Sequence, residues 1–331
     1  MNARASWNRC RYVEGDALGH YESYFQRANH PERPLAFWIR YTVFSPKRRT
    51  GDAVGELWAI YFDGERERVT AVKEVVPIRG CGFAKQGLDV RIGNAVLTDG
   101  QLKGGARSGD TTLQWDLRYR GDEPPLLLLP ESFYAREFPK AKALVGTPNA
   151  VFDGVVSVNG ATVDVSGWVG SQNHNWGSKH TDSYAWGQVA GFDDARGVFL
   201  ECATARLRFG PFWMPPLTLV VLRLDDEEIR LNSLAQAFRA HGDFDFASWR
   251  FESHRRDVHV RGTIHAPKSR FVGLTYDNPP GGTKTCLNTK LAACELTVER
   301  AGHVPRTLTT KHRAAFEILT DRQDHGVTIA A

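Results

Sequence analysis

The sequence predicts an all-β protein built from two consecutive antiparallel β-barrels, with few short helices. Apolar and polar side chains alternate with the period of two that is typical of strands. Pairs of Gly, Pro, Asn and Asp residues that favour turns separate these runs, and would join neighbouring strands as hairpins or meanders. Helical periodicity is nearly absent, so strands dominate the prediction.

In the first half, the clearest alternation covers residues 37–44, 58–62 and 113–119. It resumes at residues 155–158 and 162–168, with Asn159-Gly160 between them as a strong hairpin signal. We place the boundary between two β domains here. The prediction is an N-terminal barrel over residues 1–155 and a C-terminal barrel over residues 156–331.

The second half continues as strands, and residues 232–241 are the exception that looks helical, with Asn232 or Ser233 as the N-cap. Residues 131–138 are compatible with one or two further helical turns. Two sets of short strands fit two barrels or two sandwiches. A barrel is favoured because many strands mix polar and aromatic residues on one face, as expected for a lined cavity. The predicted strands cover residues 184–190, 198–205, 217–224, 258–264, 271–276, 291–299 and 314–319.

The composition argues against several classes of protein. Hydrophobic residues make up 42% and charged residues 24% of the 331 residues, and the net charge of +4 is thinly spread, so we expect no nucleic-acid partner. No stretch has the length of a signal-peptide core or of a membrane span, and we expect a cytoplasmic protein without an integral membrane segment. The five scattered cysteines fit reduced, buried thiols.

The richest stretch for function is residues 171–180, SQNHNWGSKH, followed by residues 184–188, YAWGQ. It combines aromatic rings, imidazoles and side-chain amides, including Asn173, next to glycines. Such residues often lie on binding or catalytic loops held by a rigid scaffold. The spacing of His174 and His180 is not a strong zinc pattern and no Cys or carboxylate cluster completes it, so we expect neither a metal nor another cofactor.

Strand geometry groups the candidate residues. Tyr184, Trp186 and Gln188 would share one face of a strand, and Phe199, Glu201 and Ala203 would share one face of the next. If those faces line a cavity, burial among aromatic rings would raise the pKa of Glu201 and make it a usable general acid.

The histidine and the aromatic rings would complete this site. His174 could orient or reprotonate Glu201, while Trp176, Trp186 and Tyr184 offer ring faces that stabilise a cation, including a transient carbocation. Two simpler interpretations stand beside this one. Residues 174–177, HNWG, could close one end of a barrel, with Trp176 filling the core and His174 bonded to backbone, and Glu201 could be an exposed strand carboxylate.

Several of these segments resemble the carotenoid 1,2-hydratase (hydroxyneurosporene synthase) and AttH-like family. They are residues 19–25 (GHYESYF), 37–41 (FWIRY), 55–62 (GELWAIYF) and, most specifically, 174–177 (HNWG) with 184–188 (YAWGQ). Tocopherol cyclases and lipocalin-like pericyclases are more distant relatives by the same resemblance. The resemblance covers most of the chain and implies two consecutive lipocalin-like barrels with a hydrophobic pocket.

In the hydratases, a histidine and a tryptophan of the HNWG segment are associated with protonation of an isoprenoid double bond, together with a tyrosine and an aspartate two residues apart. His174 and Trp176 match the first pair. Phe199 and Glu201 have the alternation of the second pair, but Phe stands in place of Tyr and Glu in place of Asp.

The leading functional hypothesis is a cofactor-independent enzyme that hydrates or cyclises a hydrophobic alkene of isoprenoid or polyketide-like type. In this hypothesis His174, Glu201 and Tyr184 are catalytic, while Asn173, Trp176, Trp186, Gln188 and Phe199 bind the substrate. A pericyclase that acts mainly by folding its substrate is one alternative. A carrier of a lipid or hydrophobic metabolite, without turnover, is another.

Overall fold

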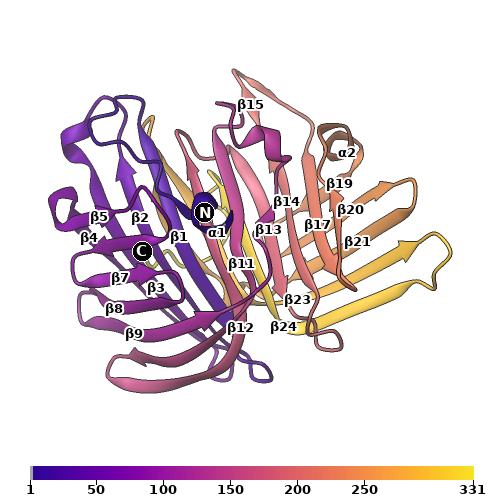
Figure 1. The fold of residues 1–331 in the computed structure, drawn as a ribbon, viewed down its shortest axis with the longest axis horizontal. Helices are drawn as coiled ribbons and strands as arrows, with labels where there is room; N and C mark the ends of the chain where they lie inside the picture. The colour runs from indigo at the N-terminus through magenta and orange to yellow at the C-terminus, as the bar shows by residue number, and fades with distance from the viewer. Residues whose placement is uncertain (1–2) are drawn as a thin grey trace.

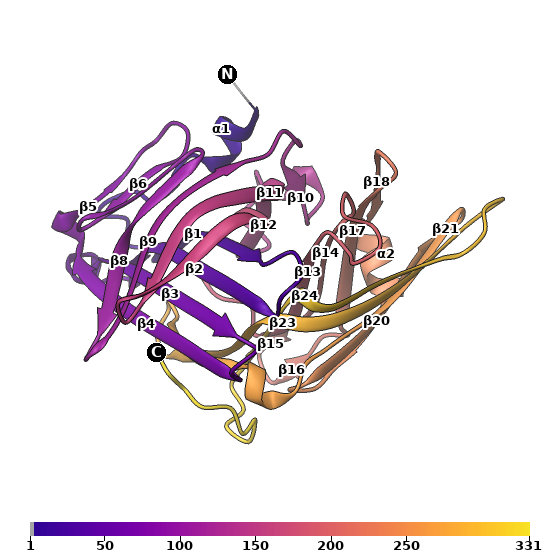
Figure 2. The ribbon, with the colours of Figure 1, turned by 90° about the horizontal axis from the view of Figure 1, so that it is seen from below.

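The computed structural model describes residues 3–331 and shows an all-β protein of two lipocalin-like barrels that lie side by side (Figures 1 and 2). A twelve-stranded antiparallel sheet forms the N-terminal barrel and a ten-stranded sheet forms the C-terminal barrel. The predicted fold class is therefore confirmed. Within residues 3–331, neither α-helix approaches the length of a membrane-crossing segment.

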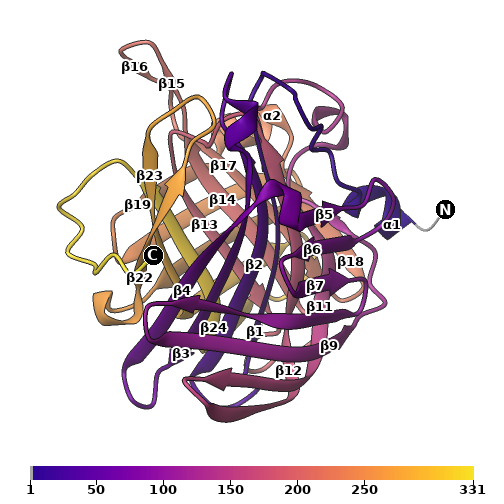
Figure 3. The same ribbon diagram turned by 90° about the vertical axis from the view of Figure 1, so that its left-hand side faces the viewer.

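The N-terminal sheet has the strand order β4-β3-β2-β1-β12-β11-β9-β8-β7-β6-β5, and β10 pairs with β11. Contacts of the edge strand β4 with β8 and β9 curl the sheet onto itself, and Figure 3 shows this barrel from its side. The strands are β1 His20–Asn29, β2 Leu35–Ser45, β3 Val54–Asp63, β4 Arg68–Pro77, β5 Cys81–Phe83, β6 Asp89–Ile92, β7 Ala95–Thr98, β8 Gln101–Ser108, β9 Thr111–Arg120, β10 Leu126–Leu127, β11 Ala141–Val158 and β12 Ala161–Gly177.

The C-terminal sheet has the order β18-β17-β14-β13-β24-β23-β21-β20-β19, and β22 pairs with β23. A separate hairpin consists of β15 Arg208–Phe209 and β16 Phe212–Trp213. The strands of the sheet are β13 Ser183–Ala190, β14 Phe199–Arg206, β17 Leu217–Leu224, β18 Glu227–Leu231, β19 His241–Phe244, β20 Ser248–Arg255, β21 Val258–His265, β22 Val272–Asp277, β23 Thr283–Arg300 and β24 Arg306–Thr320.

Both barrels repeat one plan, although the sequence shows no residue-level repeat. In each, the first strand pairs with the last, β1 with β12 and β13 with β24. The last two strands form a long hairpin, β11–β12 in one barrel and β23–β24 in the other. At the tip of the first hairpin Asn159 and Gly160 both have positive φ angles, of 51° and 84°, which explains why this dipeptide marks the turn. The duplication is one of architecture.

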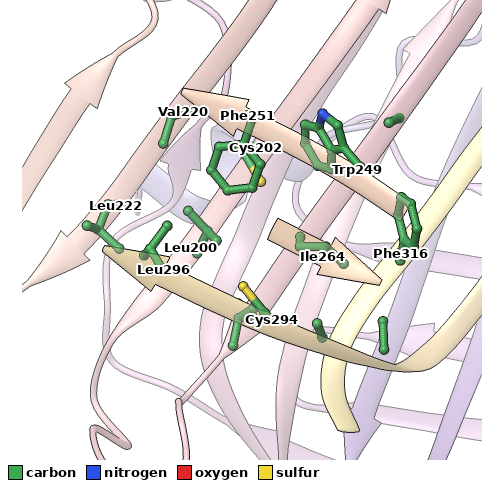
Figure 4. Packing of buried hydrophobic residues seen from close by; sticks show 14 of the residues in the cluster. Leu200, Cys202, Val220, Leu222, Trp249, Phe251, Ile264, Cys294, Leu296 and Phe316 are labelled. Atoms are coloured by element: carbon green, nitrogen blue, oxygen red, sulfur yellow. The ribbon is translucent and has the colours of Figure 1, made fainter. Parts of the chain in front are cut away.

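Each barrel has its own apolar core. In the C-terminal barrel, side chains from facing strands meet inside the sheet and fill the interior (Figure 4). Trp249, Phe251 and Phe316 form its aromatic part, and Trp249 packs 4.8 Å from Phe251, centroid to centroid. In the N-terminal barrel, Phe37, Tyr119 and Phe152 play the corresponding role.

A third apolar cluster joins the two barrels. Alternate residues of β2 and β3 that point away from the N-terminal core, such as Trp38 and Trp58, pack against residues of β13, β22, β23 and β24, such as Trp186, Tyr276 and Leu319. These strands are therefore buried on both faces, which accounts for the nearly continuous apolar runs in β2 and β3. The contact between barrels, rather than a barrel interior, is where the candidate site lies.

Two details of the sequence-based description differ from the structure. Residue 155, where we predicted the domain boundary, lies inside β11, and the chain passes from one sheet to the other between Gly177 and Ser183. The HNWG stretch, predicted as a loop, is the end of β12, paired with β1 on one side and β11 on the other. The glycines and polar residues of this stretch led to the loop prediction. A strand that is buried on both faces against polar partners does not show the alternating apolar pattern by which strands are recognised.

One of the two α-helices in residues 3–331 was predicted. Besides α1, Ala3–Asn8, the chain has α2, Leu234–Arg239, in the predicted place. Ser233 is its N-cap and forms a capping box with Gln236. Residues Glu131–Phe133 form a single 3-10 turn where one or two helical turns were predicted.

We expect Trp249→Ala to lower the free energy of unfolding by about 3–5 kcal/mol, because the indole is fully buried and its removal leaves a cavity. Urea titration followed by circular dichroism measures the change. Val304→Ala is the control, since Val304 is 85% exposed and should change stability by less than about 0.5 kcal/mol. Equal effects of the two substitutions would contradict a packed barrel interior.

Candidate functional site

A cavity of about 200 Å³ lies between the two barrels. A cavity of about 150 Å³ is enough to hold benzene, so this space suits a ligand at least that large. Its wall comes from β1, β2 and β11 on one side and from β13, β14, β17 and β24 on the other. Phe138 and Leu234 line it and are 53% and 49% exposed, which marks the mouth of the cavity near α2.

The wall is mainly aromatic and aliphatic. Aromatic rings converge from both barrels, and Trp186 packs edge to face against Phe25 at 6.0 Å between centroids. Small side chains of β14, Ala203 and Ala205, leave room beside the rings. The other aromatic residues of the wall are Tyr21, Trp38, Phe133, Tyr184 and Tyr276.

Glu201 does not itself line this cavity but lies directly behind its wall. Two of its neighbours, Ala203 on the same strand face and Trp186 across the β13–β14 pair, line the cavity. The Trp186 indole N–H donates to Oε1 of Glu201 at 2.8 Å, and the Gln188 amide donates to Oε2 at 2.8 Å. Glu201 is 2% exposed and has no ion-pair partner within residues 3–331. The predicted grouping of Tyr184, Trp186 and Gln188 with Glu201 is thus present.

Burial raises the pKa of Glu201 to about 7, and the negative charge of Glu317 adds to this shift. The hydrogen bonds from Trp186 and Gln188 and the charge of Arg27 act in the opposite direction, because they favour the carboxylate. Near neutral pH a large fraction of this carboxyl group therefore carries a proton. A buried carboxylic acid of this kind is a competent proton donor.

A second carboxyl group, Glu317, lines the cavity directly. Its Oε1 atom accepts hydrogen bonds from Lys290 Nζ at 2.7 Å and from the Asn288 amide at 2.9 Å. Lys290 is fully buried, and its ammonium group lies 5.5 Å from the ring centre of Trp186. The β23–β24 ladder is irregular between Thr289 and Ala292, and such bulges often re-aim a side chain next to a site. Glu317 thus carries the cavity's negative charge beside a fixed cation.

Three further groups in the wall are basic side chains. The Arg40 guanidinium lies 4.5 Å from the ring centre of Tyr276, and Lys142 donates to the carbonyl oxygen of Pro139 at 2.8 Å. His180 stacks on Tyr21 at 4.1 Å, and burial together with the nearby Arg40 lowers the pKa of His180 to about 3, so its imidazole is neutral. The cavity wall therefore contains more positive than negative charge.

His174 and Trp176 do not line this cavity. Side chains alternate along β12, so His174 and Trp176 point to the opposite face from Asn173 and Asn175, and Asn175 is the one that reaches the cavity wall. His174 is fully buried and bonds to Glu22 and to the Trp7 carbonyl oxygen rather than to Glu201. The prediction that His174 acts on Glu201 has no support in these contacts.

Glu22 is the centre of a separate closed network. Its carboxylate accepts hydrogen bonds from His174 Nε2 at 2.8 Å, from the Tyr24 hydroxyl at 3.1 Å and from the backbone N–H of Arg11 and Tyr12. His20 lies 3.0 Å away on the other side. Although burial opposes ionisation, these hydrogen bonds and the two imidazoles hold the pKa of Glu22 well below its usual value.

Trp176 is packed into the same region. The Arg11 guanidinium covers its ring at 3.6 Å from the centroid, and Tyr134 contacts it at 5.8 Å between centroids. This arrangement corresponds to the simpler interpretation of the HNWG stretch, in which Trp176 fills space and His174 bonds to backbone. The bond from His174 to Glu22 is an addition that the sequence did not reveal, since the partners are far apart in the chain.

Two of the remaining predicted residues, Gln188 and Asn173, belong to a hydrogen-bonded chain that leads to Glu201. Gln188 also bonds to Asn173, to Ser171 and to Arg27, all at 2.6–2.8 Å. Phe199 packs in a small apolar cluster between the barrels and not in the cavity wall. Asn173 and Gln188 thus hold the carboxyl group, while Tyr184 and Trp186 form the wall.

Sequence reasoning missed Arg40, Lys290 and Glu317. A signal was present for two of them, because Arg40 and Glu317 are single charged residues inside strongly apolar strand segments, FWIRYTVF and AAFEIL. A buried, unexplained charge in such a segment is a candidate functional group. Within residues 3–331, no cluster of three or more His, Cys, Asp or Glu side chains is arranged to hold a metal ion.

The fold and the cavity together define a lipocalin-like protein of two barrels with a ligand-sized space at their contact. Comparison with known proteins agrees with this class. No protein-family profile matches the chain. Two uncharacterised proteins of Mycobacterium tuberculosis, from strains CDC 1551 / Oshkosh and ATCC 25618 / H37Rv, are each 26% identical over 302 residues, which cover 89% of this chain and 86% of theirs.

Solved structures with the same fold are more distant in sequence. An AttH-like protein of Nitrosomonas europaea has a TM-score of 0.58 and 14% identity, covering 93% of this chain and 98% of its own. Kievitone hydratase of Nectria haematococca has a TM-score of 0.57 and 11% identity, with 97% and 96% covered. CghA, solved with Sch210972, has a TM-score of 0.54 and 11% identity, with 92% and 88% covered. The AttH-like fold is therefore shared over most of the chain.

We expect Glu22→Gln to lower the free energy of unfolding at pH 7 by about 3–5 kcal/mol, because it removes the charge that the buried network surrounds. The folded-state pKa of Glu22 lies below its unfolded value, so the difference from wild type should shrink as the pH falls below about 4.5. Urea titrations across this pH range measure it. Glu252→Gln is the matched control, since Glu252 pairs with His259 at the surface and should contribute less than about 1 kcal/mol. A similar small effect at both positions would contradict the network.

Glu201 should show the opposite pH dependence. Its pKa is about 7 when folded and near 4.5 when unfolded, so the folded state binds the extra proton and wild-type stability should fall as the pH rises from about 4.5 to 7. The Glu201→Gln variant lacks this pH-dependent contribution. Between pH 4.5 and 7 its free energy of unfolding should therefore rise by about 3 kcal/mol relative to that of wild type. Urea titrations at closely spaced pH values measure the change. A constant difference between the two proteins would exclude a raised pKa.

Proposed function

We propose that the protein is a cofactor-independent enzyme that hydrates or cyclises a hydrophobic alkene in the cavity between the barrels. The observation that carries this proposal is a pair of carboxyl groups whose surroundings differ, Glu317 in the cavity wall and Glu201 directly behind it. Among residues 3–331 no cation is bonded to Glu201, whose pKa is about 7, whereas Glu317 is bonded to Lys290. When two carboxyl groups of one site have different environments, one commonly acts as the acid and the other as the base.

In the proposed reaction, Glu201 is the acid. Its O–H bond breaks and a C–H bond forms at one carbon of the substrate double bond, which leaves a carbocation at the other. The ring faces of Trp186 and Tyr184 stabilise that positive charge. The hydrogen bonds from Trp186 and Gln188 stabilise the carboxylate that remains.

The carbocation is then captured by an oxygen atom. In a hydration the oxygen belongs to water, and in a cyclisation it belongs to a hydroxyl group of the substrate. The C–O bond forms, the oxygen loses its proton to the Glu317 carboxylate, and transfer of a proton from Glu317 back to Glu201 restores the starting state. No redox partner is needed, since the overall change adds water or isomerises the substrate.

Other features support a hydrophobic substrate of isoprenoid or polyketide-like type. The cavity wall is mainly aromatic and aliphatic, and its mouth is flanked by the exposed side chains of Phe138 and Leu234. One structure with the same fold is that of a hydratase, which fits the proposed reaction class. In this proposal His174 and Trp176 are structural, Glu317 takes the catalytic role that the sequence suggested for His174, and Tyr184 keeps its predicted place at the site.

Isotope labelling tests the reaction directly. The purified protein is incubated, in D₂O and separately in H₂¹⁸O, with an apolar extract of the cells that produce it, and products are followed by mass spectrometry. A hydration should incorporate both a carbon-bound deuterium and ¹⁸O, and a cyclisation should incorporate deuterium without ¹⁸O. We expect Glu201→Gln to reduce the rate at least about 100-fold, the usual contribution of a general acid, while a bound substrate still co-purifies.

Glu295→Gln is the control, because Glu295 is exposed on β23 and does not line the cavity. A carrier would deplete one compound from the extract without any labelled product. A pericyclase would give an unlabelled isomer. Either of these results, or equal rates in wild type and Glu201→Gln, would overturn the proposed mechanism.

A further inference from the structure

Arg40 is a buried cation that has no hydrogen-bonding partner among residues 3–331. It projects from β2 between the barrels, lines the cavity and is 7% exposed. Its Nε atom is buried without an acceptor, and no carboxylate among residues 3–331 forms an ion pair with the guanidinium. A buried arginine that lacks an anion is unusual, because removal of its charge from water is costly unless it is paired.

The neighbouring rings do not satisfy this group. The guanidinium lies 4.5 Å from the ring centre of Tyr276 and 5.9 Å from that of Trp38. Contact with a ring face stabilises the charge but leaves the N–H groups, which lie in the guanidinium plane, free to donate. These donors match the two oxygens of a carboxylate or an enolate.

The carboxylates that could neutralise Arg40 are already engaged. Glu317 accepts from Lys290 and Asn288, and Glu56 pairs with Lys73 at 2.9 Å and accepts from the Trp58 indole. Lys142, the other cation in the cavity wall, is bonded only to a carbonyl oxygen among the described residues. The charges of Glu56 and Glu317 act on Arg40 without a hydrogen bond to it, and within residues 3–331 the cavity wall keeps two cations, Arg40 and Lys142, against the single carboxylate of Glu317.

We propose that the ligand of this cavity is a hydrophobic molecule that carries an oxyanion, either a carboxylate or an enolate, and that Arg40 binds this group. The inference rests on the proposed function in that it names the substrate class of the same site. The apolar part of the ligand would lie against Trp186 and Ala203, near Glu201, and the anionic end would lie at Arg40 between Tyr276 and Trp38. Arg40 then orients the substrate and takes no part in proton transfer.

A matched pair of probes tests the inference. 2-Naphthoate and 2-naphthalenemethanol have the same two-ring body and differ in the anionic group, and their binding can be followed by titration calorimetry or by the fluorescence of Trp38 and Trp186. Wild type should bind the carboxylate at least tenfold more tightly than the alcohol. Arg40→Met should lower affinity for the carboxylate at least tenfold and leave affinity for the alcohol within about twofold. Arg40→Lys, which keeps the charge, should retain part of the preference.

Arg250→Met is the control, because Arg250 is exposed on β20 and the same substitution there should change neither affinity. Thermal unfolding of each variant, and the retained binding of the alcohol, separate loss of the anion site from loss of the fold. Equal affinities of wild type for the two probes, equal losses of both in Arg40→Met, or no binding of the carboxylate would each overturn the inference.

These outcomes are distinguishable from those of the labelling experiment, because the probes bind without turnover. A carrier without catalytic activity would still show the Arg40-dependent preference. An enzyme for uncharged alkenes would form labelled products but show no preference for the carboxylate.

Discussion

Burial of β1, β2, β3, β13 and β24 on both faces is the constraint on which the rest of the structure depends. One face of each strand packs into its own barrel, and the other face packs against the neighbouring barrel. A polar group on the second face is costly unless it finds a partner across the contact between barrels, because little water reaches this surface. Arg27 and Asn29 of β1 find such partners, since they donate to Gln188 and to the carbonyl oxygen of Lys290 in the other barrel. Among residues 3–331, Arg40 Nε finds none. The relative position of the barrels is therefore fixed by polar contacts as well as by apolar packing.

The same constraint explains how much could be predicted from the sequence. Period-two alternation, the Asn159-Gly160 turn and the helix near Ser233 were enough for the fold class, because each depends on neighbours in the chain. The face shared by Tyr184, Trp186 and Gln188, and that shared by Phe199 and Glu201, followed from the same period. When both faces of a strand are buried, alternation cannot show which face points into its own barrel and which packs against the other barrel.

This ambiguity accounts for the misplaced residues. His174 and Trp176 lie one position out of phase with Asn173 and Asn175, and a shift of one residue moves a side chain to the other face of the strand. Their partners, Glu22 and Arg11, are more than a hundred residues away in the chain, so no local pattern could reveal them. Arg40 and Glu317 were detectable only as charges out of place in apolar segments, and the contact between barrels gives those charges a reason to be there.

The polar clusters around Glu22 and Glu201 differ in how their surroundings shift the pKa of the central carboxyl group. Around Glu22, the imidazoles, backbone N–H groups and the Tyr24 hydroxyl surround the carboxylate and lower its pKa. Among residues 3–331, Glu201 accepts from two uncharged donors, its pKa is raised to about 7, and the cavity wall lies directly in front of it. A fully satisfied network stabilises a fold, whereas a carboxyl group left partly unsatisfied beside an open space retains free energy that a substrate can recover on binding. This contrast is why we propose a functional centre at Glu201, Glu317 and Arg40 and not at the histidine that the sequence makes most conspicuous.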